Sequence, residues 1–321
     1  MAVAFLETTG DRHLRLIGGV TALERRVREL AKSGAEKVVV AAAPVAFPRA
    51  LAVPVEFVAA LPADAVAERA DVISGIELVD DAACARAEWQ LIRRTNKSFE
   101  GPVDALINWR FSMRITRVLS HRSLAVTPNH ITIVAILLGL FASFLVTRGG
   151  YANLAIAGVL LEVNSILDSC DGELARLRFQ YSKLGQWLDN LSDDIVDNAF
   201  IAACGYAIGG IWFPLGCAAA GGRLLVQVVT YVSVYARTGT GDIFAFRWFF
   251  ETDKATADDV YDPKAISTWL RSFGRRDTYV FIWMIACLAG FPYWIVGHGL
   301  VIAGVNLTLL VLHFTVYRKR R

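Results

Sequence analysis

The pattern of hydrophobic and polar positions divides the chain into two parts. Over residues 1–100, apolar and charged positions alternate at short intervals, whereas residues 130–317 contain several long apolar runs. A run of about twenty apolar residues is long enough to cross the hydrocarbon core of a bilayer as a helix. The pattern therefore predicts a soluble domain of residues 1–100 and, after a linker, a membrane domain of residues 128–321.

The first part has the pattern of a layered α/β domain. Short apolar and β-branched runs predict strands, and a charged segment with helical spacing between the first two runs predicts a helix. The predicted strands are 3–6, 37–43 and 55–60, and the predicted helices are 22–33 and 80–94. Strand, helix and strand in this order are typical of a domain in which helices cover a sheet.

The second part is predicted to be an all-α membrane domain of six transmembrane helices. The apolar runs that predict them are 131–147, 152–170, 189–208, 211–235, 278–292 and 294–316. Acidic residues interrupt the end of the second run and the beginning of the third. Because consecutive membrane helices run in opposite directions, these two groups of acids are predicted to lie at the same membrane face.

Between the two parts, residues 101–127 are predicted to form an amphipathic helix and a linker. From Trp109 to Arg122, apolar residues interleave with arginines at helical spacing. The arginines are Arg110, Arg114, Arg117 and Arg122, and the apolar residues are Trp109, Phe111, Ile115, Val118 and Leu119. A basic helix of this kind is typical of one that lies in the membrane interface. The alternative is a linker helix packed on the soluble domain.

The composition indicates a membrane protein with lipid as its charged partner. Hydrophobic residues make up 55% of the chain, and the mean hydropathy is +0.44. The net charge is only +3, and no basic block indicates nucleic acid, so anionic lipid is the favoured electrostatic partner. Five cysteines form no CxxC pair and have no ligand-like spacing with the histidines, so neither zinc nor a disulfide framework is indicated.

The positions of the basic residues predict the orientation in the membrane. The loop 237–277 and the tail are rich in arginine and lysine, whereas the opposite loops offer essentially Arg148 alone. Because cytoplasmic loops carry the excess of basic residues, both termini and the acidic segment are predicted to face the cytoplasm from the inner cell membrane. The first twenty residues carry acids and no long apolar core, which argues against a cleaved signal peptide.

Four aspartates in the acidic segment are spaced as metal ligands would be. Asp168 and Asp171 are three residues apart, and Asp189 and Asp193 are four apart, so each pair lies on one face of its helix. Four clustered carboxylates repel one another unless a cation lies among them. Oxygen ligands alone suit Mg²⁺ or Mn²⁺ better than zinc.

The residues beside these acids suit a substrate with a pyrophosphate group. Gly172 and Gly185 carry no side chain next to the carboxylates, so a ligand can approach the backbone closely. Arg176 provides a planar group of donors that suits a phosphate. In such a site, catalysis consists mainly of positioning and neutralisation of charge.

The segment from Asp168 to Asp193 follows the pattern DxxDGxxAR(x8)GxxxDxxxD. In this it resembles the signature of the CDP-alcohol phosphatidyltransferase family, position by position. The resemblance implies that CMP is displaced from a CDP-linked alcohol, usually CDP-diacylglycerol, by the hydroxyl of a second alcohol. It also implies a homodimer.

The resemblance further implies roles for individual residues. Asp168, Asp171 and Asp189 would bind metal, and Asp193 would be the general base and a further ligand. Residues 127–132, TPNHIT, are similar to the family's PNxIT segment at the entry to the first span. The residues implied for the CDP substrate are Asn129, Thr132, Asp168, Gly172, Ala175, Arg176 and Gly185.

Arginines near the fourth and fifth spans are candidates for binding the acceptor. Arg237 ends the fourth span in a segment similar to the family's phosphate-binding helix, and Arg275 and Arg276 precede the fifth. Together they favour a phosphorylated acceptor such as inositol phosphate or glycerol 3-phosphate. The alternative for each is a charge that sets topology and reaches the lipid headgroups. Arg223 falls inside the fourth span, and the sequence names no partner for it.

Residues 17–42 are similar to the opening strand, helix and strand of sugar-phosphate nucleotidyltransferases. That family has a glycine-rich nucleotide loop just upstream, but here the segment reads ETTGDRHLRL, with Gly10 as its one glycine. A loop with so little glycine is poorly suited to cradling a triphosphate with backbone amides. The front domain is therefore expected to be a degenerate, noncatalytic relative, with an active cytidylyltransferase as the alternative.

Two other classes of function remain as alternatives to a transferase. One is a noncatalytic scaffold that senses lipid or nucleotide, in which the front domain binds a partner. The other is an ion or proton transporter with carboxylates in the membrane, although transport would not require Gly172, Ala175, Arg176 and Gly185 at these spacings. Asp194 and Asp197 are expected to be polar neighbours of the site, and Cys170 a small packing residue.

Overall fold

The computed structural model describes residues 2–95, 102–121, 125–239, 246 and 274–319, apart from the side chains of 183 and 316–319. The described chain forms two compact units. One consists of Met1–Thr95 with Arg117–Ala125, and the other of Asn96–Thr116 with Val126–Arg321. Most of the predicted basic loop 237–277 and the end of the basic tail lie outside the described residues.

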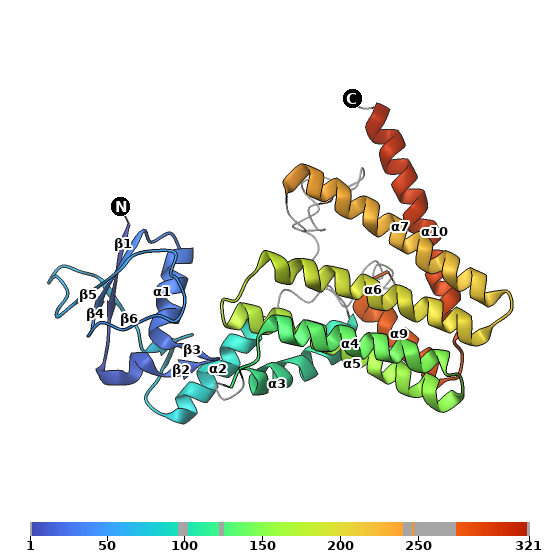
Figure 1. The fold of residues 1–321 in the computed structure, drawn as a ribbon. Helices are drawn as coiled ribbons and strands as arrows, with labels where there is room; N and C mark the ends of the chain where they lie inside the picture. The colour runs from blue at the N-terminus through green and yellow to red at the C-terminus, as the bar shows by residue number, and fades with distance from the viewer. Residues whose placement is uncertain (1, 96–101, 122–124, 240–245, 247–273, 320–321) are drawn as a thin grey trace. The chain divides into compact units, whose positions relative to one another are not determined.

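The first unit is an α/β domain, as predicted (Figure 1). Its strands are β1 Val3–Glu7, β2 Leu16–Ile17, β3 Val20–Thr21, β4 Lys37–Ala41, β5 Val55–Val58, β6 Ala67–Arg69, β7 Val72–Ile73 and β8 Ile76–Glu77; its helices are η1 Gly10–Leu14, α1 Ala22–Lys32 and α2 Asp81–Thr95. The main sheet has the order β5-β4-β1-β6, and all its neighbours are parallel. Two hairpins, β2-β3 and β7-β8, complete the unit.

The core of this unit lies between the sheet and helix α1. The hydroxyl of Thr21 accepts a hydrogen bond from the Glu24 amide and so caps the start of α1. Leu23 and Val27 on that helix pack with Leu6 of β1 and with the apolar residues of β4. The short apolar run of the first strand and the helical spacing that follows it therefore predict these two elements correctly.

The segment in which a nucleotide loop was expected is instead the short 3₁₀ helix η1. Gly10 opens it with φ +57°, a conformation that suits glycine. Arg12 Nη1 donates to Glu77 Oε1 at 2.6 Å, and Arg69 Nη2 donates to the same oxygen at 2.7 Å and to the buried Asp71 at 2.8 Å. The Arg69 guanidinium holds the pKa of Glu77 below its usual range. Both arginines of this cluster are thus paired with acids of their own unit.

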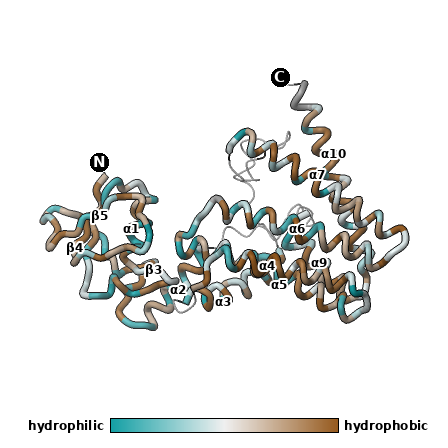
Figure 2. The backbone as a smooth tube through the Cα atoms, in the orientation of Figure 1, coloured by the Kyte–Doolittle hydropathy of each residue, from teal (hydrophilic) through white to brown (hydrophobic). Residues whose placement is uncertain are grey.

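The second unit is a bundle of helices (Figure 1). Its elements are η2 Asp104–Asn108, α3 Trp109–Leu119, α4 Pro128–Thr147, α5 Tyr151–Leu177, α6 Lys183–Ile208, α7 Trp212–Thr238, α9 Arg276–Leu288 and α10 Tyr293–Lys319, of which α3 ends in the first unit. Helix α4 packs against both α5 and α6, α7 packs against α6 and α10, and α9 packs against α5. Hydrophobic residues predominate along α4 and α5 in Figure 2.

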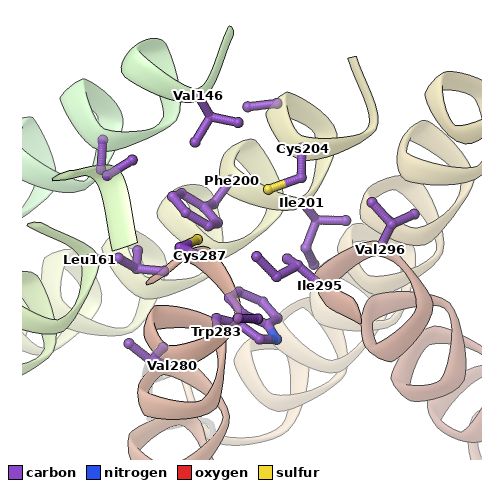
Figure 3. Packing of buried hydrophobic residues seen from close by; sticks show 14 of the residues in the cluster. Val146, Leu161, Phe200, Ile201, Cys204, Val280, Trp283, Cys287, Ile295 and Val296 are labelled. Atoms are coloured by element: carbon purple, nitrogen blue, oxygen red, sulfur yellow. The ribbon is translucent and has the colours of Figure 1, made fainter. Parts of the chain in front are cut away.

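The bundle core is built from α4, α5, α6, α7, α9 and α10 (Figure 3). Phe200 and Trp283 stack in it with ring centroids 6.2 Å apart. Small residues let the helices come close: a Cβ atom on Gly139 of α4 would lie 2.4 Å from Val196 Cγ1 of α6, and one on Gly158 would lie 2.5 Å from Cys287 Cβ. The side chains that face each other across these helices therefore fit a fixed helix spacing.

Four helices, rather than the six predicted, are long and apolar enough to cross a membrane by themselves. They are Pro128–Thr147, Tyr151–Leu177, Trp212–Thr238 and Tyr293–Thr315. The predicted spans 189–208 and 278–292 correspond to α6 and α9. Helix α6 has 26 residues but carries four aspartates, and α9 has only 13 residues, which extend roughly 20 Å. Length and hydropathy therefore do not identify α6 and α9 as membrane-spanning helices.

Candidate active site

The four aspartates of the acidic segment lie at neighbouring ends of two helices. Asp168 and Asp171 belong to the last turns of α5, and Asp189 and Asp193 to the first turns of α6. Ligand oxygens of Asp168, Asp171 and Asp189 all lie within 4.8 Å of one another. Asp193 is outside this group. The predicted cluster thus consists of three convergent carboxylates and a fourth that has another partner.

Helix α4 supplies the polar contacts around Asp171. Thr127 accepts from the His130 amide while the His130 side chain reaches back to the Thr127 amide, so the segment TPNHIT forms a capping box that starts the helix. One turn later, the Thr132 hydroxyl donates to Asp171 Oδ2, and both side chains are buried. The segment similar to the family's PNxIT therefore positions a hydroxyl that orients one of the three carboxylates.

Gly185 allows the starts of α4 and α6 to come together. Its amide donates to Ser182 Oγ at 2.8 Å, which caps α6. A Cβ atom at this position would lie 2.8 Å from Ser182 Oγ and 3.0 Å from Asn129 Oδ1. A side chain larger than hydrogen would therefore displace the Asn129 amide, one of the groups expected at the CDP substrate.

Gly172 has a similar role beside Arg176. A Cβ atom on Gly172 would lie 3.0 Å from Arg176 Nη1, so the glycine leaves room for the guanidinium along the last turns of α5. Ala175 is partly buried on the same helix. The residues predicted for a pyrophosphate thus gather where α5 ends, next to the three carboxylates.

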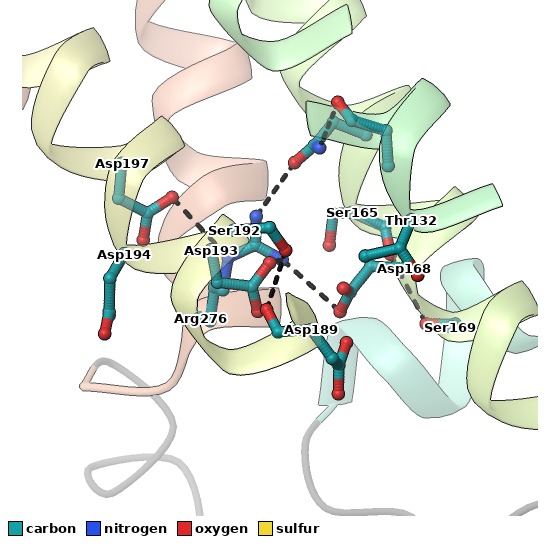
Figure 4. A network of polar contacts seen from close by, with 12 residues as sticks. Thr132, Ser165, Asp168, Ser169, Asp189, Ser192, Asp193, Asp194, Asp197 and Arg276 are labelled. Carbon is teal, nitrogen blue, oxygen red and sulfur yellow. Dashed lines mark hydrogen bonds and ion pairs between the residues drawn. The ribbon is translucent and has the colours of Figure 1, made fainter. Parts of the chain in front are cut away.

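Asp193 is paired with Arg276, which begins α9 (Figure 4). The distance from Arg276 Nη1 to Asp193 Oδ1 is 2.9 Å, and the same nitrogen is 3.5 Å from Asp168 Oδ2. Arg276 was predicted as a ligand for an acceptor phosphate. In this structure it lies between two aspartates of the signature, and its role toward an acceptor stays a prediction.

The other two arginines predicted for the acceptor lie at helix ends. Arg237 is exposed in the last turn of α7. Arg275 is the residue before α9, and its Nε atom is 3.5 Å from Asp277 Oδ1. A phosphate near either residue would meet a guanidinium that is at least partly accessible to solvent.

A buried polar network continues from the site into the bundle, and the sequence did not predict its pairing. Arg223 of α7 lies 3.3 Å from Asp197 Oδ2 and 3.2 Å from the Tyr279 hydroxyl. Asp194 accepts a hydrogen bond of 2.9 Å from the Tyr231 hydroxyl. The partner of Arg223 is therefore Asp197, four residues after Asp193 and so on the same face of α6.

Glu173 is a further residue of this region that the sequence analysis missed. It is 2% exposed, and it accepts hydrogen bonds from Ser112 Oγ at 2.6 Å and Thr116 Oγ1 at 2.7 Å. The first turns of α3 are thus hydrogen-bonded to α5 at a position between Asp171 and Arg176. Arg110 and Arg114 on α3 are exposed. The only signal in the sequence is the spacing of the two hydroxyls, four residues apart on one helix face.

A comparison with protein families agrees with this geometry. Residues 125–310 match the family model described as CDP-alcohol phosphatidyltransferase, and this range covers more than half of the chain. The chain belongs to the CDP-alcohol phosphatidyltransferase family. The matched range begins just before α4 and includes α5, α6, α7 and α9, so every aspartate of the site lies within the family domain.

Curated relatives of this chain include proteins that are named as bifunctional. A "Bifunctional IPC transferase and DIPP synthase" of Aquifex aeolicus is 29% identical over 69% of the chain and 45% of the relative, and one of Thermococcus kodakarensis is 36% identical over 45% and 33%. An "Archaetidylinositol phosphate synthase" of Pyrococcus horikoshii is 38% identical over 30% of the chain and 48% of the relative. The matches thus cover less than half the length of each of these relatives.

Proposed function

We propose that this membrane protein transfers a substituted phosphate group from a CDP-linked alcohol to the hydroxyl of a second alcohol and releases CMP. The observation that carries the proposal is the convergence of Asp168, Asp171 and Asp189 inside a complete family signature. A noncatalytic scaffold would not need three carboxylates arranged for a metal beside an arginine. We propose CDP-diacylglycerol as the donor.

The three carboxylates fit a divalent cation. They offer oxygen ligands only, which Mg²⁺ and Mn²⁺ prefer, and without a cation their negative charges would repel one another at this distance. The bound ion would neutralise the pyrophosphate and stabilise the charge of the leaving CMP. The Thr132 hydroxyl orients Asp171, so ligand geometry does not depend on the ion alone.

The remaining site residues can position the substrates for a balanced displacement. Arg176, beside Gly172, and the Asn129 amide, beside Gly185, are proposed to bind the CDP moiety. Asp193 is proposed as the base that takes the proton from the acceptor hydroxyl. The acceptor oxygen then forms a bond to the phosphorus that carries the first alcohol, and the bond from that phosphorus to CMP breaks.

We propose inositol phosphate as the first acceptor to test, with glycerol 3-phosphate as the second. The name of the Pyrococcus horikoshii relative includes an inositol phosphate product, and Arg237 in the last turn of α7 and Arg275 just before α9 offer guanidinium groups. Arg276 is not included, because its guanidinium is paired with aspartates.

We further propose that α6 and α9 complete a six-span domain with its termini in the cytoplasm, and that the protein is a homodimer. Aspartates of α6 pair with Arg223 of α7 and Arg276 of α9, which would allow a charged helix to cross a bilayer. Single cysteines at Gly149, Gly209 and Gly290 should all be labelled from the outside of intact cells. Labelling of any of them only after lysis would contradict this topology.

The proposal is tested with the full chain purified into lipid nanodiscs. CDP-diacylglycerol is combined with inositol phosphate, glycerol 3-phosphate or no acceptor, and CMP and lipid products are measured by mass spectrometry. We expect CMP and a phosphatidylinositol phosphate in equal amounts, with Mg²⁺ or Mn²⁺ required. Nucleotide or lipid binding without CMP release under any of these conditions would favour the scaffold.

A further inference from the structure

Asn164 and Asp197 lie outside the signature, yet both contact the arginine that lies between two of its aspartates. Asn164 Oδ1 accepts a hydrogen bond of 2.8 Å from Arg276 Nη2. Asp197 Oδ1 lies 3.5 Å from Arg276 Nε, and both of these residues are labelled in Figure 4. Asn164 is 2% exposed and Asp197 is 1% exposed. The guanidinium of Arg276 is therefore hydrogen-bonded to one amide and lies within ion-pair distance of one carboxylate from the bundle interior.

Each of these two side chains is itself held in one orientation. The Asn164 amide nitrogen donates to the Ala135 carbonyl of α4 at 2.8 Å, so its oxygen has to face Arg276. Asp197 is held on its other oxygen by Arg223 and by the Tyr279 hydroxyl. A buried guanidinium with such contacts has little freedom to rotate.

The other side of Arg276 contacts the signature. Its Nη1 atom is 2.9 Å from Asp193 Oδ1, while Oδ2 of Asp193 has no hydrogen bond to any of the described residues. The Asp193 side chain is 23% exposed. One oxygen is thus fixed by the arginine, and the other is left for a hydrogen bond from an acceptor hydroxyl.

We propose that Asn164 and Asp197 are positioning residues that hold Arg276 between Asp168 and Asp193. This proposal rests on the proposed function. Arg276 bridges Asp168 and Asp193 and contacts only one oxygen of Asp193, which leaves the other oxygen for the acceptor proton.

The test uses the full chain in nanodiscs with the variants Asn164→Leu and Asp197→Asn. For both we expect kcat to fall at least tenfold, whereas the KM for CDP-diacylglycerol and the Kd for Mn²⁺, measured by electron paramagnetic resonance, stay within twofold. Gln227→Leu is the matched control: this side chain bonds to Asn198 and Asp194 in the same bundle, not to Arg276, so kcat should stay within twofold.

A double-mutant cycle separates positioning from general damage to the bundle. Lysine keeps the charge of Arg276 but cannot make all of its contacts, so in an Arg276→Lys background the further loss from Asn164→Leu should be under threefold. Equal losses in both backgrounds, an unchanged kcat in the single variants, or a parallel loss of Mn²⁺ affinity would each overturn the inference. Because Asp197 also pairs with Arg223, Asn164→Leu, which removes no charge, is the variant to rely on if Asp197→Asn does not fold.

Different results would overturn the proposed function and this inference. If the wild-type protein releases no CMP, the function is wrong. If the wild type is active and Asp193→Asn is not, but the Asn164 and Asp197 variants keep the wild-type kcat, only the positioning role is wrong.

Discussion

At the scale of single residues, the aspartate carboxylates of this bundle have three different kinds of surroundings. Asp168, Asp171 and Asp189 face one another, Asp193 faces Arg276, and Asp197 faces Arg223 and Tyr279. A buried charge needs an opposite charge or several donors. In the first group three carboxylates lie within 4.8 Å of one another, and this concentration of negative charge is the physical reason to expect a cation there.

Replacing any of the three convergent aspartates by asparagine should abolish activity. The substitution keeps the size of the side chain and removes one negative charge from the ligand set, so Mn²⁺ affinity should fall at least tenfold. Electron paramagnetic resonance of Mn²⁺ measures the affinity, and CMP release measures the activity. Asp81→Asn, at the start of α2 in the α/β unit, is the control and should change neither.

Arg237→Ala and Arg275→Ala should weaken acceptor binding. A charge-assisted contact to a phosphate contributes roughly 1.5 to 3 kcal/mol, so each variant should raise the acceptor KM about tenfold or more. The KM for the CDP donor should change little, whereas Arg176→Ala should affect the donor instead. An unchanged acceptor KM in both variants would assign these arginines to topology or lipid contact.

At the scale of elements, the end of α5 is where three helices of the bundle meet. Thr132 of α4 bonds to Asp171, Ser112 and Thr116 of α3 bond to Glu173, and Arg276 of α9 approaches Asp168. Three side chains within less than two turns of one helix thus receive polar contacts from three different elements. The position of the carboxylates is fixed by these contacts as well as by apolar packing.

The double variant Ser112→Ala with Thr116→Val should be less stable than the wild type. It leaves the buried Glu173 without its two hydroxyl donors, which costs roughly 1 to 3 kcal/mol for each missing bond, and more for a charged group. Thermal unfolding in detergent measures the loss. Adding Glu173→Met should recover most of it, because the unpaired group is then gone. Thr147→Val, at an exposed hydroxyl in the last turn of α4, is the control.

The sequence predicts secondary-structure elements and candidate metal ligands here better than it predicts which side chains contact each other. The spacing of four aspartates and two glycines is local information, and the structure brings Asp168, Asp171 and Asp189 together as that spacing suggests. Arg276 is 108 residues from Asp168, and nothing local in the sequence shows that these two side chains meet. The apolar runs of α6 and α9 also predict two transmembrane helices, although the charge of α6 and the short length of α9 distinguish them from the other four.

At the scale of the whole molecule, the two units have separate cores and different chemistry. The α/β unit packs α1 on a four-stranded parallel sheet, whereas the helical unit contains the whole family signature. Relatives named as bifunctional match this chain over less than half of their length. The activity of the α/β unit therefore has to be judged from its own residues.

We predict that the full chain does not make a CDP-alcohol from CTP. Gly10 is the one glycine of the expected nucleotide loop, and Arg12 and Arg69 are bonded to Asp71 and Glu77, so a triphosphate would have few free donors there. The protein is incubated with CTP and inositol phosphate, and pyrophosphate is measured. CMP release from CDP-diacylglycerol by the same preparation shows that it is folded. Pyrophosphate above background would contradict this prediction and support the alternative of an active cytidylyltransferase.

The close approach of Gly139 to Val196 limits how far α4 and α6 can separate before the metal-binding aspartates move. Val196 lies three residues beyond Asp193 on α6, and a methyl group on Gly139 would overlap its Cγ1 atom at 2.4 Å. To relieve that overlap, α4 and α6 would have to separate by an amount larger than the roughly 0.5 Å within which a metal site keeps its ligands in place. A glycine that touches no substrate would then limit how tightly the ion is bound.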